Sequence, residues 1–127
     1  MKKPRQPRYK QIFAHDEAMQ ETAATKWAEA IAHLTENDWI TDGRVAVADR
    51  YARAYAEYEH LYPIAVLEGP VKVGPNGGDV FNFNWSTVEK LNERIAKLEL
   101  KLRIDPAEGA NEKPPQTKPT AADDYLG

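Results

Sequence analysis

The sequence predicts a mainly α-helical fold with a small β-hairpin, built on a helical hairpin core. Apolar residues recur every three to four positions over three long segments, as they do on one face of a helix. A glycine-rich segment separates two short β-prone runs, as in a hairpin. The apolar helical faces are more than one small core needs, so we favour contacts between subunits.

Length and charge restrict the class of protein. The chain has 127 residues and a net charge of −3, which fits one domain and leaves nucleic-acid contact to local clusters of positive charge. It has no cysteine. No apolar run approaches the roughly 20 residues that span a bilayer, and no signal peptide is recognisable. We therefore expect a soluble, intracellular protein.

Residues 1–14 are predicted to be a flexible basic arm, because prolines and like charges disfavour a packed helix. The arm is the best candidate for DNA binding, since clustered cations neutralise phosphates and release counterions. A solubilising tail is the alternative. Tyr9 is expected either to stack on a base or to pack on the fold. The candidate DNA-binding residues of the arm are Lys2, Lys3, Arg5, Arg8 and Lys10.

Two helices are expected next, within a core and oligomerisation domain over residues 15–105. The first covers 15–34, and the second begins near Thr41 or Asp42 and reaches about residue 61, where Pro63 should end or kink it. The second helix adds Arg50 and Arg53 as candidate DNA-binding residues, although salt bridges within the helix are an equal alternative. Its aromatic face supplies candidate oligomerisation residues: Tyr51, Tyr55 and Tyr58.

A β-hairpin about 70–83 and a last helix complete this domain. Gly74–Gly78 supplies the hairpin turn. Ser86 and Glu89 have the spacing of a capping box, so the helix should begin there and end at Asp105-Pro106. Its apolar seam fits either a core within one chain or subunit contacts, and we favour the second. The seam residues, which we take as oligomerisation candidates, are Val88, Leu91, Ile95, Leu98 and Leu102.

Residues 106–127 hold four prolines and few large apolar groups, so we expect a disordered tail. Tyr125 and Leu126 stand near its end beside two aspartates, a composition typical of a docking peptide. No phosphate-binding loop, nucleophile elbow or metal-ligand spacing is recognisable, and the three histidines are scattered. We therefore expect neither an enzyme nor a cofactor or metal site.

The order of these elements resembles the small terminase subunits of tailed phages, in the branch with a central helical hairpin and a β-hairpin. The resemblance spans about residues 20–106 and is one of layout and spacing, with Asn84-Trp85 where many relatives have Asn-Pro. The matching segments are Trp27-Ala28-Glu29-Ala30, the aromatic helix 49–58, Gly69 with Gly77-Gly78, and Leu100–Pro106.

The resemblance implies a viral DNA-packaging adaptor in the host cytoplasm. Such a protein forms a homo-oligomeric ring of about eight to eleven subunits. It binds double-stranded phage DNA and recruits and regulates the large terminase subunit, the ATPase and nuclease, for which Tyr125 and Leu126 are candidate docking residues. The alternative is a dimeric helical DNA-binding regulator or a scaffolding protein. A two-fold regulator would read two half-sites.

Overall fold

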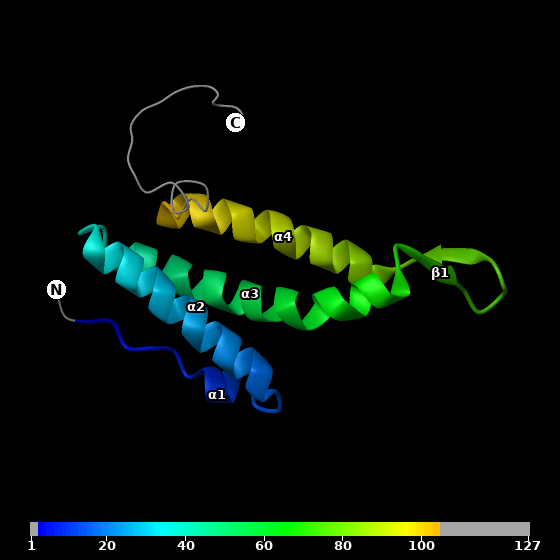
Figure 1. Cartoon of the computed structure of the whole chain (residues 1–127), viewed down its shortest axis with the longest axis horizontal. Coiled ribbons are helices and arrows are strands. Elements are labelled where there is room, and N and C mark those ends of the chain that lie inside the picture. Colours follow the sequence, from blue (N-terminus) through cyan, green and yellow to red (C-terminus); the bar gives the residue numbers. More distant parts are fainter. Residues whose placement is uncertain (1–2, 105–127) are drawn as a thin grey trace, which may run out of the picture.

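The computed structural model describes residues 3–104 of the chain. The central element is a long helix, α3, which lies between α2 and α4 and packs against both (Figure 1). The prediction of a mainly helical fold is confirmed. In chain order the elements are α1 (Tyr9–Ile12), α2 (Glu17–Glu36), α3 (Asp42–Glu68), β1 (Val71–Val73), β2 (Asp79–Phe81) and α4 (Phe83–Leu102).

Side-chain caps set the starts of α2 and α3. The Asp16 carboxylate accepts a hydrogen bond from the Met19 amide at 3.0 Å, and the Thr41 hydroxyl accepts one from the Arg44 amide at 3.1 Å. Each bond satisfies an amide that has no partner within the first turn of its helix. The two helices therefore begin within two residues of the predicted positions.

The predicted end of the second helix near residue 61 was wrong, because α3 continues through Pro63 to Glu68. A proline inside a helix removes one donor to the carbonyl four residues earlier. Pro63 and Glu59 are both exposed, so water can satisfy the freed carbonyl. The helix ends instead at Gly69, whose φ of 81° is accessible to glycine and whose amide donates to the Ala65 carbonyl at 2.8 Å.

The start predicted at Ser86 for the last helix was also wrong, because α4 begins at Phe83 with Asn82 as its cap. The Asn82 side chain accepts a hydrogen bond from the Asn84 amide at 3.0 Å and donates one to the Gly69 carbonyl at 2.6 Å. It is fully buried. Asn82 therefore joins the end of α3 to the start of α4, and Ser86 lies inside the first turns of the helix. At the other end α4 stops at Leu102, before the predicted Asp105-Pro106, with Arg103 in the left-handed conformation.

The hairpin between α3 and α4 has an antiparallel register that pairs Val71 with Phe81 and Val73 with Asp79. Within the turn, the Gly77 amide donates to the Gly74 carbonyl at 3.0 Å, and Gly77 has a φ of 86°. The two strands extend beyond the end of the helices (Figure 1).

The interpretation of the α4 seam as a subunit interface was wrong. Its side chains are buried within the chain, because α4 runs antiparallel to α3 and covers the apolar face of that helix. Tyr51 is buried in the same core, and its hydroxyl lies 3.4 Å from a Glu99 carboxylate oxygen. These side chains stabilise the subunit itself. The seam comprises Val88, Leu91, Ile95, Leu98 and Leu102.

The structure also differs from the prediction of a flexible arm over all of residues 1–14. Residues 9–12 form α1, which packs against α2. The Tyr9 side chain is only 2% exposed and belongs to the hydrophobic core. Burial of one large aromatic side chain gives this segment a fixed place on the bundle, which the charge pattern alone did not predict.

Candidate nucleic-acid interface and self-association surface

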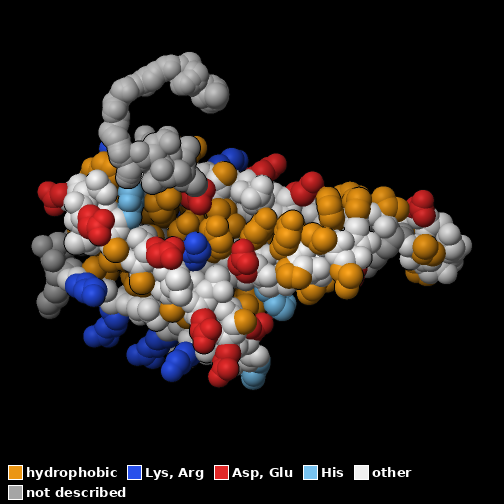
Figure 2. Space-filling view, in the orientation of Figure 1, with side chains coloured by type: hydrophobic (Ala, Val, Ile, Leu, Met, Phe, Trp, Pro, Cys, Tyr) orange, Lys and Arg blue, Asp and Glu red, His pale blue; other side chains and the backbone are white. Residues whose placement is uncertain are grey.

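Positively charged side chains gather along one edge of the molecule, where the N-terminal segment and α1 lie (Figure 2). Lys3, Arg5, Arg8 and Lys10 are all exposed. Among residues 3–104, none of these four forms an ion pair with a carboxylate. Their charges are therefore available to a polyanion.

Tyr9 holds this basic segment against the helices. Its hydroxyl donates a hydrogen bond to the Asp49 carboxylate on α3 at 2.9 Å, and its ring stacks on Phe13 with centroids 6.4 Å apart. Burial raises the pKa of the Tyr9 hydroxyl well above its usual range, and the hydrogen bond to Asp49 raises it further. Tyr9 is thus a neutral anchor and not a base-stacking side chain.

Asp49 connects the basic segment to the candidate DNA-binding arginines predicted on the second helix, which is α3. Its other oxygen pairs with the Arg53 guanidinium at 3.2 Å, which is the intrahelical salt bridge that the spacing allowed. Arg50 is exposed and lines, together with Arg53 and Arg94, a shallow depression of about 350 Å³ between α3 and α4. Arg94 was not among the predicted site residues, because only the register between α3 and α4 brings it beside Arg50 and Arg53. The Glu57 carboxylate also lines this depression.

Three predicted site residues lie outside the described part of the chain. They are Lys2 of the basic arm and the docking residues Tyr125 and Leu126. The whole predicted tail, 106–127, lies there as well.

Large apolar side chains gather at the opposite end of the molecule, a surface we name the apolar tip. It includes nine of the eleven large hydrophobic side chains that are exposed within residues 3–104. Figure 2 shows these side chains over the end of α3, the start of α4 and the hairpin. The members of the apolar tip are Tyr62, Ile64, Val66, Leu67, Val71, Val73, Val80, Phe81 and Phe83.

The tip is uncovered because α2 is shorter than α3. The N-terminal end of α2 lies beside residue 60, where the His60 imidazole is 3.4 Å from the Asp16 carboxylate. Beyond that point α4 is the only described helix beside α3 (Figure 1), and every side chain of β2 is exposed. Monomeric proteins seldom expose large apolar patches, and a two-stranded hairpin is marginal alone. The tip is therefore the best candidate for a self-association surface.

Two predicted oligomerisation residues, Tyr55 and Tyr58, are half-buried on α3. The Tyr55 ring packs edge-on against Tyr51 with centroids 5.5 Å apart, and the Lys26 ammonium lies 4.3 Å above its face. Tyr58 stacks on Tyr62 with centroids 5.5 Å apart. The row of tyrosines therefore leads from the core to the apolar tip.

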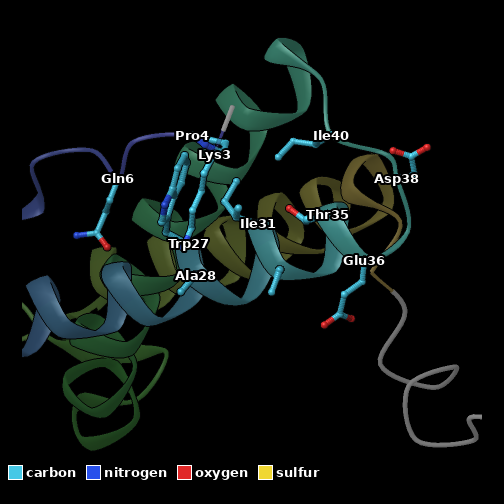
Figure 3. Close-up of a pocket in the computed structure, with 11 residues that line it drawn as sticks. Lys3, Pro4, Gln6, Trp27, Ala28, Ile31, Thr35, Glu36, Asp38 and Ile40 are labelled. Carbon is cyan, nitrogen blue, oxygen red and sulfur yellow. The ribbon is translucent and has the colours of Figure 1, made fainter. Parts of the chain in front are cut away.

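A mixed apolar and polar groove of about 770 Å³, which we name the Trp27 groove, lies between the N-terminal segment and α2 (Figure 3). Ala28 and Ala32 are exposed along its floor above the buried Trp27 and Ile31, and Pro4 and Ile40 contribute further apolar surface. The charged side chains differ in sign between its two ends. Lys3 lies toward one end, and Glu36 and Asp38 lie toward the other (Figure 3).

Within residues 3–104, no cluster of three histidine or acidic side chains is arranged to hold a metal ion. No helix in this part of the chain is both long and apolar enough to cross a membrane. The chain matches no protein-family model, curated protein or solved structure at a significant level. The function must therefore be inferred from the surfaces described above.

Proposed function

We propose that this chain is a viral DNA-packaging adaptor, a terminase small subunit that binds duplex DNA and self-associates into a ring. The observation that carries the proposal is the basic N-terminal segment, whose exposed cations are held on the bundle by the buried Tyr9. A segment with one anchored end loses less conformational entropy when it binds than a free tail does. It is suited to contact phosphates without reading bases.

The apolar tip supports the assembly part of the proposal. Its nine side chains together expose on the order of 900 Å², if each contributes roughly 100 Å², compared with about 800 Å² per partner in a standard interface. The exposed apolar area of the tip is therefore comparable with what one partner contributes to a standard interface. Recruitment of the large subunit by Tyr125 and Leu126 follows from the layout resemblance and belongs to the same proposal.

The DNA-binding part is tested by measuring the affinity of the full chain for a duplex over a range of salt concentrations. We expect the triple variant Arg5→Ala/Arg8→Ala/Lys10→Ala to bind more weakly. The slope of log affinity against log salt should also fall by about 0.9 for each phosphate that the variant no longer neutralises.

A matched control has the same change in net charge on α4, where Lys90, Lys97 and Lys101 are all exposed. Changing these three lysines to alanine should leave the salt slope close to that of the unmodified chain. Equal weakening in the two triple variants would mean that binding depends on net charge alone, and the basic segment would be rejected as the DNA interface.

A further inference from the structure

We propose that the end of this chain's own C-terminal segment, residues 121–127, docks in the Trp27 groove and competes with DNA for the basic N-terminal segment. The occupant is a named stretch of this chain outside the described residues, with the sequence Ala-Ala-Asp-Asp-Tyr-Leu-Gly. Three features of the described structure support this assignment: where the chain leaves α4, the apolar floor of the groove, and the distribution of charge around it.

The chain leaves α4 beside one end of the groove. The His33 imidazole Nε2 lies 2.9 Å from the Arg103 carbonyl oxygen, and the Arg103 guanidinium lies 4.9 Å from the Trp39 ring centroid. The first contact holds the end of α4 against the last turn of α2, which supplies Thr35 and Glu36 to the groove, and the second holds it against the connection that follows α2. Residues 105–120 can bridge up to roughly 50 Å when extended. The groove follows about ten residues of α2, roughly 15 Å at the helical rise.

The chemistry of residues 123–126 complements the groove. Tyr125 and Leu126 are large apolar side chains, and the exposed alanines Ala28 and Ala32, together with Pro4 and Ile40, offer apolar surface to cover them. The preceding aspartates, Asp123 and Asp124, suit the end of the groove that carries Lys3. At the other end, Glu36 and Asp38 would repel them (Figure 3). The charge distribution therefore selects one direction of binding.

Docking in this direction places two carboxylates beside Lys3, one of the cations proposed to bind phosphate. A tethered segment has an effective concentration in the millimolar range, so even weak docking competes with DNA and lowers its apparent affinity a few fold. The competition rests on the proposed DNA-binding function, whereas the docking itself does not depend on it. The two claims can therefore fail separately.

Docking is tested by disulfide trapping, for which the chain offers a background without cysteine. Ala28 in the groove is exposed, so Ala28→Cys combined with Ala122→Cys should leave the fold intact. Under mild oxidation we expect a disulfide within one chain, seen as a monomer-sized band of altered mobility. The control pair is Thr25→Cys with Ala122→Cys, because Thr25 is exposed on the same helix but lines a different depression, beside Tyr55.

The proposal requires the Ala28 pair to oxidise at least several times faster than the Thr25 pair. Equal rates, or a disulfide that joins two copies in place of one within a chain, would overturn docking of the segment in its own groove. Competition is tested separately with Asp123→Asn/Asp124→Asn and with deletion of residues 121–127. We expect duplex affinity to rise about three- to tenfold in both. Unchanged affinity, alongside a trapped disulfide, would overturn the competition alone.

Discussion

The apolar tip makes the most specific prediction about assembly, because both of its phenylalanines are mostly exposed within one subunit. Phe81 is 63% exposed and Phe83 is 80% exposed, so Phe81→Ser/Phe83→Ser removes little that stabilises the monomer. Full burial of a phenylalanine contributes about 1.5–3 kcal/mol. Scaled by the exposed fractions, the pair contributes about 3 kcal/mol to each contact between copies, which is on the order of a hundredfold in its dissociation constant.

Sedimentation velocity at a series of concentrations measures this change directly, and thermal unfolding of the same samples reports on the subunit. We expect the double variant to dissociate at concentrations at which the unmodified chain is assembled, while its helical content is retained. Leu100→Ser is the matched control, since Leu100 is 77% exposed but lies at the other end of α4. An equal effect of Leu100→Ser, or no effect of the double variant, would refute the tip as the self-association surface.

Three further predictions concern the fold that positions these surfaces. Asn82→Ala should lower the free energy of unfolding by about 2–3 kcal/mol, because it leaves the Gly69 carbonyl and the Asn84 amide without their partner. Chemical denaturation measures this change. A decrease below about 0.5 kcal/mol would contradict the role of Asn82 in joining α3 to α4. Tyr9→Phe should leave the helical content unchanged but weaken duplex binding, because the basic segment loses its bond to Asp49; unchanged affinity would argue against the anchor. Burial raises the folded-state pKa of Tyr9 and of Tyr51, so their contribution to stability is complete below the unfolded value near 10 and decreases at higher pH. Denaturation between about pH 9 and pH 12 should therefore show a shallower decline for Tyr51→Phe than for the unmodified chain, whereas an identical slope would contradict this effect of burial.

The helices could be predicted from the sequence wherever local periodicity and caps agree. Asp16 and Thr41 cap helices near the expected positions, and the glycine-rich turn forms an antiparallel hairpin. The start of α4 could not be predicted in this way. Ser86 has the better local motif, but Asn82 also donates to the Gly69 carbonyl, thirteen residues away in sequence. That contact exists only after the hairpin has closed.

The candidate surfaces could be predicted only in part. Exposed cations on the N-terminal segment were predictable, because clustered charge and prolines are visible in the sequence. The burial of Tyr9 was not, since it depends on Asp49, forty residues further along the chain. The periodicity of the α4 seam identifies an apolar face without identifying what covers it, so it does not distinguish a core within one chain from a subunit contact. The position of the apolar tip depends on where α2 begins relative to α3, which periodicity does not report.

Native mass spectrometry of the full chain, alone and with a short duplex, is the sharpest test of the proposed assembly and of its DNA binding together. The packaging adaptor predicts a single assembly of about eight to eleven subunits, as a closed ring requires. That assembly should add the mass of bound duplex at low salt. A monomer at micromolar concentration would contradict the proposal, and a dimer that binds duplex would favour the two-fold DNA-binding regulator instead.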